Sequence, residues 1–235
     1  MQDMELQLRK EAVMTKKTGR CLLLSLILSV AFILYTLLVK CINVEAIGPK
    51  GSSVGFAGIN QAFINFVGYN NLAYNISEIA GYLSIAVAGV LALYGVYQLV
   101  TRKSLKKVDP DLYVLCGVYV ITVVLYVLFD KAIVINYRPV ILDEGLEPSF
   151  PSTHSMLSIV IMLTAAATIR HRVKNRVKRA IINGALYFVM ALVLVMRIMS
   201  GVHWITDIIG GVLLGLTIVS VYYTGYRYVK NKYMS

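Results

Sequence analysis

The chain has 235 residues, of which 58% are hydrophobic, and a mean hydropathy of +0.71. A soluble domain of this length carries far less apolar sequence, so the composition excludes that class and indicates several membrane spans. The net charge of +11 would suit nucleic acid if the chain were soluble. In a membrane protein this excess is typical of cytoplasmic loops, so we expect a bilayer and no nucleic acid as partners.

The N-terminal segment is polar and basic to residue 20, and an apolar run follows over residues 21–39. No small-x-small cleavage pattern precedes the next polar segment, so we expect an uncleaved first span rather than a signal peptide. The three cysteines (Cys21, Cys41 and Cys116) show no metal-ligand spacing, and we infer neither a metal nor a disulfide from them.

A short amphipathic helix is predicted after the first span, in the mixed segment 41–77. Phe56, Ile59, Phe63 and Val67 recur at helical spacing. Two placements are open for this helix. It either lies in the membrane interface or packs against the bundle.

Five further apolar runs predict the remaining spans, at about residues 79–100, 112–129, 153–169, 180–196 and 204–223. Pro110 fits the first turn of the third span. We therefore expect an all-α bundle of six transmembrane helices that forms one domain over residues 1–235. The amphipathic helix would lie between spans one and two.

The distribution of Lys and Arg predicts the orientation. The two tails and the loops after spans two and four hold 18 of the 23 basic residues. The other side holds only Lys40, Lys50, Lys131, Arg138 and Arg197. By the positive-inside rule both termini are cytoplasmic, and Lys131, Arg138 and Arg197 face outward.

His203 and Asp207 form the first candidate pair, because residues four apart at a helix start share a face. The carboxylate would fix the tautomer of the imidazole and stabilise the charge that develops when the ring attacks. A pair that only satisfies itself within the bundle is the alternative. Arg197 lies six residues earlier, and Gly201 between them permits a tight turn that brings guanidinium and imidazole together.

Two other span ends carry compatible groups. Lys131 and Arg138 close the third span, and Pro139 favours an extended backbone at Arg138; both side chains could instead snorkel to the interface. Ser152 is a candidate helix cap, and the free amides behind it would bind an anion beside His154. A plain capped helix start is the alternative.

These residues form three spaced motifs. They are Lys131 with Arg138-Pro139, Pro151-Ser152-Thr153-His154, and Arg197 with His203 and Asp207. The set resembles the type-2 phosphatidic acid phosphatase superfamily, which includes vanadium haloperoxidases and bacterial acid phosphatases, and in particular its membrane lipid phosphatase branch. The chain departs from the family pattern at Thr153, where glycine is usual, and at Met196, where serine is usual.

The resemblance implies a role for each residue. His203 would accept the phosphoryl group as a phosphohistidine, Asp207 would orient it, and His154 would protonate the leaving oxygen and then activate water. The phosphate oxygens would be held by Lys131, Arg138, Arg197 and the amides near Ser152 and Thr153. No metal or other cofactor would be required, because the cations meet the transition-state charge.

Two further features allow alternatives. The acidic residues Asp143, Glu144 and Glu147 form either a solvated, gating loop or a metal site. Trp204 is either an interfacial aromatic residue or a wall of the substrate opening.

We therefore predict an integral-membrane, metal-independent lipid phosphatase of the bacterial plasma membrane, with its site facing outward. A polyprenyl diphosphate is the first candidate substrate, followed by phosphatidylglycerol phosphate and phosphatidic acid. A lipid phosphotransferase and a non-enzymatic lipid-binding or transport protein are the alternatives.

Overall fold

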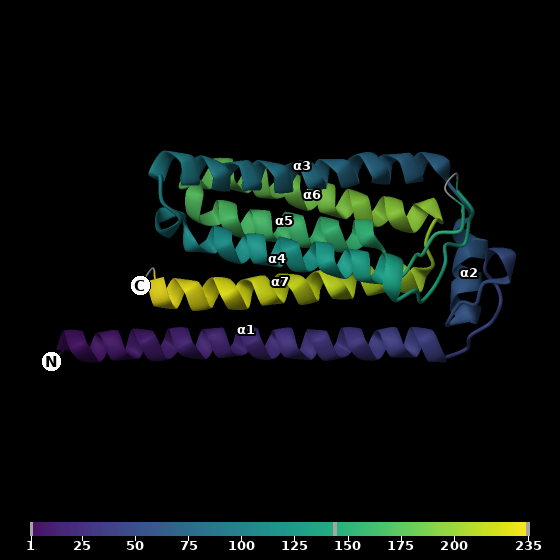
Figure 1. The fold of residues 1–235 in the computed structure, drawn as a ribbon, viewed down its shortest axis with the longest axis horizontal. Helices are drawn as coiled ribbons and strands as arrows, with labels where there is room; N and C mark the ends of the chain where they lie inside the picture. Colours follow the sequence, from purple (N-terminus) through teal and green to yellow (C-terminus); the bar gives the residue numbers. More distant parts are fainter. Residues whose placement is uncertain (1, 143–144, 234–235) are drawn as a thin grey trace.

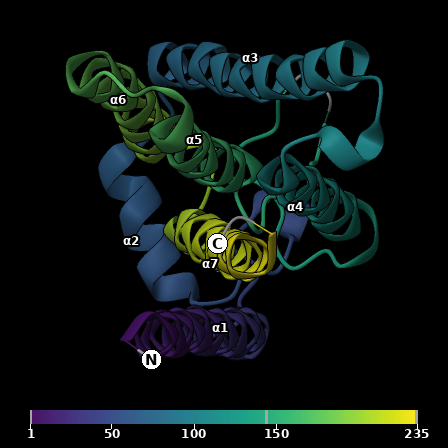
Figure 2. The same cartoon turned by 90° about the vertical axis from the view of Figure 1, so that its left-hand side faces the viewer.

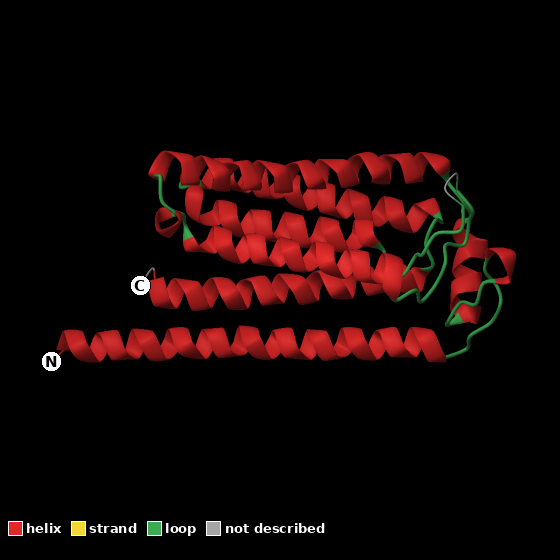
Figure 3. Ribbon diagram, viewed as in Figure 1, coloured by secondary structure: helices red, strands yellow, loops and turns green. Residues whose placement is uncertain are grey.

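The computed structural model describes residues 2–142 and 145–233, and these residues form helices joined by loops (Figure 3). The α-helices are α1 (Gln2–Cys41), α2 (Ala57–Val67), α3 (Asn71–Arg102), α4 (Pro110–Val127), α5 (Thr153–Arg172), α6 (Arg176–Ser200) and α7 (Ile205–Tyr233). Two 3₁₀ turns, Pro49–Gly51 and Leu105–Lys107, and one π turn, Leu128–Ala132, complete them.

Six of these helices are long and apolar enough to cross a membrane, and α2 is the short exception. The six long helices run side by side, and both termini lie at one end of the bundle (Figure 1). Helix α2 and the loop between α4 and α5 lie at the opposite end, which we call the α2 end. The prediction of an all-α, six-span bundle is confirmed.

Helices α5 and α7 form the inside of the bundle. In their most apolar windows 61% and 67% of residues are buried, against 17–28% in the other four spans. Helix α7 packs on α1, α4 and α5, and α5 also packs on α3 and α6 (Figure 2). Both inner helices begin at the α2 end, so their first turns lie close together inside the protein.

Helix α3 begins earlier than the sequence pattern predicted. The side chain of Asn70 accepts a hydrogen bond from the amide of Ala73 at 3.0 Å, which caps the helix at Asn71. The predicted start at residue 79 is therefore wrong by eight residues. As a result, Glu78 lies inside the span rather than in the loop before it.

Helix α2 packs against the bundle, which is one of the two placements that its pattern allowed. Buried Asn60 donates hydrogen bonds to the carbonyl of Gly55 at 2.7 Å and to the hydroxyl of Thr206 at 2.9 Å, which fixes α2 to the start of α7. Ile59 and Phe66 lie on its exposed side, where an amphipathic helix at this depth meets the membrane interface.

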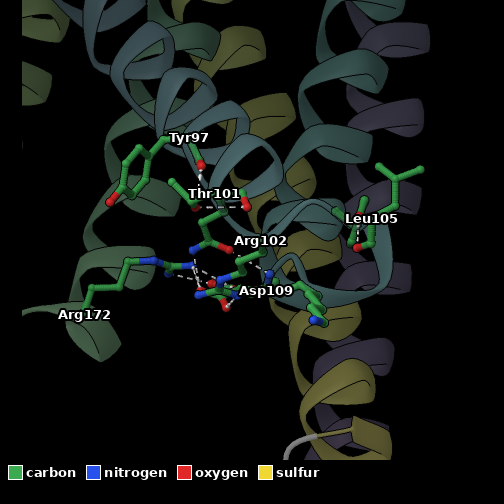
Figure 4. A network of polar contacts seen from close by, with 10 residues as sticks. Tyr97, Thr101, Arg102, Leu105, Asp109 and Arg172 are labelled. Carbon is green, nitrogen blue, oxygen red and sulfur yellow. Dashed lines mark hydrogen bonds and ion pairs between the residues drawn. The ribbon is translucent and has the colours of Figure 1, made fainter.

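A charge cluster closes the terminal end of the bundle (Figure 4). The guanidinium of Arg172 on α5 forms a bidentate contact with Asp111, at 2.7 and 3.0 Å, and reaches Asp109 at 3.2 Å. Asp109 is partly buried, yet hydrogen bonds from Gln98 and Arg102 hold its pKa below the usual range. The cluster joins the α3–α4 connection to α5. Arg172 is therefore paired within the protein.

Candidate active site

A cavity of about 560 Å³ opens at the α2 end, between the first turn of α5, α3 and the loop that precedes α5. Five of the eight predicted site residues line it: Lys131, Arg138, Thr153, His154 and His203. The other three, Ser152, Arg197 and Asp207, are fully buried next to it. The structure therefore brings together residues from three separate parts of the sequence.

His203 lies in the turn between α6 and α7. Gly201 ends α6 with a φ of +63°, a conformation that glycine adopts without strain. The imidazole is buried, and neither ring nitrogen has a hydrogen-bond partner among the described residues. Its Nδ1 lies 3.9 Å from Oδ2 of Asp207, which is beyond hydrogen-bond distance. Hydrogen bonds of this kind are commonly long before substrate binds and shorten in the reacting complex.

Asp207 is held by two donors that the motifs did not include. Its Oδ1 accepts from Nδ2 of Asn136 at 2.9 Å, and its Oδ2 accepts from the amide of Trp204 at 3.1 Å. Asn136 lies in the loop between α4 and α5 and is buried. These two bonds fix the carboxylate plane beside His203.

The environment of His203 keeps its imidazole neutral. Burial, and then the positive charges of Arg138 and Arg197, hold the pKa of His203 well below its usual range. A neutral imidazole has a free lone pair, which is the form that a nucleophile requires. The arginines that would bind an anion therefore also favour the neutral form of His203.

Arg197 is fully buried at the end of α6. Its Nη2 donates to the carboxylate of Glu78 on α3, and its guanidinium lies over the ring of Tyr74 at 5.4 Å from the centroid. Its Nε and Nη1 are buried and have no acceptor among the described residues. Such groups are rare in folded proteins, so they indicate an anion-binding site.

Arg138 has the same arrangement on the other side of the cavity. Its Nη2 lies 2.8 Å from Oε2 of Glu147, whereas its Nε and Nη1 are buried without an acceptor in the described part of the chain. Trp204 donates its indole N–H to the carbonyl of Tyr137 at 2.7 Å, and this bond holds the residue before Arg138. Trp204 is 2% exposed, so it neither faces the interface nor lines the opening, and both earlier interpretations of it are wrong.

Lys131 lies at the rim of the cavity rather than among the buried cations. Its side chain is 79% exposed, and its ammonium lies 2.8 Å from Oδ2 of Asp130. Of the acidic loop, Asp143 and Glu144 lie outside the described residues, and Glu147 pairs with Arg138.

The start of α5 differs in two details from the prediction. Ser152 occupies the N-cap position, but its side chain makes no capping bond and accepts from the hydroxyl of Ser155 at 3.0 Å. Its amide donates to the carbonyl of Asp207 at 2.9 Å, so this amide is not available to phosphate. The first intrahelical bond of α5 comes from Met156, which leaves three earlier amides for an anion: those of Thr153, His154 and Ser155.

The two departures from the motif pattern have different consequences. Thr153 has a helical backbone with negative φ, so threonine presents its amide as glycine would. Met196 supplies no hydroxyl, and the nearest hydroxyl on α6, that of Ser200, donates to the carbonyl of Arg197 at 2.9 Å.

The sequence matches the profile of the PAP2 superfamily over residues 81–231, which is more than half of the chain and includes all three motifs. The chain belongs to the PAP2 superfamily. The family predicted from the motifs is therefore confirmed. No curated protein matches the chain in a sequence search.

Two solved structures are similar to this chain. One is a transmembrane PAP2 type phosphatidylglycerolphosphate phosphatase from Bacillus subtilis, with a TM-score of 0.60, 17% identity, and 85% of this chain and 94% of that chain covered. The other is LpxE from Aquifex aeolicus, with a TM-score of 0.42, 21% identity, and 72% and 95% covered. The first likeness supports a multi-pass membrane fold of the PAP2 phosphatase type.

Proposed function

We propose that this PAP2 protein is a lipid phosphatase that hydrolyses a phosphomonoester or diphosphate through a phosphohistidine on His203. Neutral His203 would attack phosphorus, and the bond from phosphorus to the leaving oxygen would break. His154 would give its proton to that oxygen and then take a proton from the water that attacks the phosphohistidine, and the bond from phosphorus to His203 would break to release phosphate. Asp207 would stabilise the cationic ring.

Phosphate binding is assigned to the groups that lack protein acceptors. The free guanidinium nitrogens of Arg138 and Arg197 and the first amides of α5 surround the cavity, and Lys131 would assist from the rim. These cations would stabilise the charge of the transition state without a metal.

One observation carries the proposal that the substrate is a lipid. From His154 a groove runs between α3 and α4 along the bundle, through three cavities of about 260, 260 and 620 Å³ that share lining residues. The first and second share Ile85, Tyr126 and Leu157, and the second and third share Tyr119 and Val123. Away from His154 most side chains along it are apolar, and Thr122 and three tyrosines are the exceptions among the described residues. The leaving group beside His154 would therefore be the one that carries an apolar tail.

The length of the groove favours a long tail. Its lining on α3 extends from Glu78 to Leu99, which corresponds to about 32 Å at 1.5 Å per residue. This is close to the thickness of the hydrocarbon core, roughly 30 Å, and exceeds one leaflet. A polyprenyl diphosphate fits this length better than the acyl chains of phosphatidic acid or phosphatidylglycerol phosphate, which remain second candidates.

A polar cavity of about 860 Å³ adjoins the site on its aqueous side. It shares Tyr74 and Glu147 with the site cavity and would admit water and release phosphate. If the protein were a phosphotransferase instead, its acceptor would reach the site through this cavity in place of water.

The function is tested by phosphate release from purified protein in detergent, in excess EDTA, with a long polyprenyl diphosphate, a short one and phosphatidic acid. We expect release in EDTA and the highest kcat/KM for the long polyprenyl diphosphate. Ala88→Trp, which narrows the groove, should lower hydrolysis of the long substrate more than that of the short one. A strict magnesium requirement would contradict the mechanism, and a labelled acceptor without free phosphate would identify a transferase.

We also propose that both termini are cytoplasmic and that the α2 end faces outward. The natural Cys41 is exposed where α1 ends at the α2 end, whereas Ser104 lies at the terminal end. A variant that keeps only Cys41 should react with a membrane-impermeant maleimide in intact cells. A cysteine-free variant with Ser104→Cys should react only after lysis, and the reverse result would invert the topology.

A further inference from the structure

Glu78 is an acidic residue inside a transmembrane helix that none of the motifs includes. It lies two turns after the start of α3 and is the only Asp or Glu of that helix. An ionisable side chain at this depth is disfavoured unless it has partners, and it commonly marks a functional site. Its side chain is 21% exposed and lines the site cavity.

The two oxygens of Glu78 have different partners. Oε1 accepts from Nη2 of Arg197, and Oε2 lies 3.3 Å from Nε2 of His154. One carboxylate thus links a phosphate-binding cation to the proposed general acid.

Helix α3 also positions the imidazole of His154, because the ring packs directly against Gly81. A Cβ at Gly81 would lie 2.5 Å from Cδ2 and 3.0 Å from Nε2 of His154, so only glycine allows the ring to pack this closely. The Cδ2–Nε2 edge therefore faces α3. Nδ1 is the ring nitrogen that remains for the leaving oxygen.

The charges around His154 explain why a carboxylate is needed there. The ring of His154 lies near the guanidinium groups of Arg138 and Arg197, and each of these positive charges disfavours the protonated form of the ring. In the part of the site that the structure describes, two other carboxylates have partners of their own: Glu147 pairs with Arg138, and Asp207 accepts from Asn136 and Trp204. The remaining ionisable groups of the site are Lys131 with Asp130 on the π turn, Tyr126 on α4, Tyr74 and Tyr82 on α3, and His203 between α6 and α7.

We propose that Glu78 is the positioning residue of the general acid His154, and this inference rests on the proposed phosphatase function. Its carboxylate accepts the Nε2–H bond and balances the charge of the imidazolium, so that Nδ1–H points to the leaving oxygen. When the bond between phosphorus and that oxygen breaks, the Nδ1 proton moves to the oxygen and the ring becomes neutral. The site then contains two histidine–carboxylate pairs, Asp207 with His203 and Glu78 with His154.

A purely structural role for Glu78, as the counter-charge of Arg197, makes a different prediction. Loss of that contact would disturb phosphate binding for every substrate alike. Loss of the contact with His154 would affect only substrates whose leaving oxygen must be protonated. An alkoxide is strongly basic and needs the proton, whereas 4-nitrophenolate leaves without it.

The test compares kcat/KM of Glu78→Gln on dodecyl phosphate and on 4-nitrophenyl phosphate, because kcat/KM includes only the steps up to cleavage. We expect kcat/KM to fall on both substrates, because the contact with Arg197 is weakened, and to fall about 10²-fold further on the alkyl substrate than on the aryl substrate. Glu147→Gln, which removes the carboxylate from Arg138, is the matched control and should lower both values alike. Gel filtration in detergent and thermal unfolding check the fold.

Equal losses of Glu78→Gln on both substrates, or no loss on either, would overturn the inference. If Glu78→Gln does not fold, Glu78→Asp takes its place, and the quantity compared is kcat/KM on the alkyl substrate divided by kcat/KM on the aryl substrate. A ratio equal to that of the wild-type protein overturns the inference, and a reduced ratio supports it. Wild-type protein that hydrolyses neither substrate nor any lipid phosphate would instead refute the proposed function.

Discussion

His203→Asn should abolish phosphate release, with a loss of at least about 10⁵-fold, because the proposed covalent intermediate forms on the ring of His203. The side chain is buried between Arg138 and Arg197, and asparagine fits the space without adding charge. The measurement is the initial rate of phosphate release, together with trapping of labelled protein from a ³²P-labelled substrate. Wild-type protein should give a label that is labile in acid and stable in alkali, as a phosphohistidine is, and the variant should give none.

His171→Asn is the matched control for this substitution. His171 belongs to the last turn of α5, at the terminal end of the bundle, and should leave both rate and label unchanged. A labelled His203→Asn protein that still turns over would place the nucleophile on another residue and end the mechanism as proposed.

Asp207→Asn should lower kcat about 10³-fold or more while the protein remains folded. The substitution removes the charge that stabilises the cationic ring of His203. Both oxygens of Asp207 accept hydrogen bonds, one from Nδ2 of Asn136 and the other from the amide of Trp204. In the variant the side-chain NH₂ group replaces one of these oxygens, so two hydrogen-bond donors face each other. The measurement is kcat at saturating substrate with thermal unfolding as the check on folding.

Asn136→Ala tests how much of this loss comes from the orientation of the Asp207 carboxylate rather than from its charge. It removes one of the two donors and keeps the charge, so we expect a loss of about 10- to 100-fold, the usual size for a residue that orients a reacting group. A loss in Asn136→Ala as large as that in Asp207→Asn would show that the loop, rather than the carboxylate, sets the geometry of His203.

Much of this architecture could be predicted from the sequence. Long apolar runs specify transmembrane helices because every backbone polar group must be satisfied within the bilayer. The three motifs identified the family and five of the residues that line the cavity, because cations and histidines that gather at several span ends commonly mark a functional site. The amide of Ser152 was assigned wrongly, since no local pattern shows that the carbonyl of Asp207 accepts it.

The missed residues are those whose role depends on long-range contacts. Glu78 meets Arg197 and His154 across 119 and 76 positions of the chain, and Asn136 meets Asp207 across 71. A signal existed for Glu78, an acidic residue next to an apolar run, but the predicted helix start at residue 79 placed it in a loop. Asn136 gave no signal, because an asparagine in a polar loop is ordinary.

The main-chain hydrogen bond from the amide of Ser152 to the carbonyl of Asp207, at 2.9 Å, joins the first turns of the two inner helices. A membrane of different thickness changes the tilt of transmembrane helices, and here α5 and α7 would pivot about that joined end. The separation of the two imidazoles would then stay constant while the helices spread toward the other leaflet. Lipid composition should accordingly alter how the apolar tail is accommodated and leave the phosphoryl chemistry unaffected.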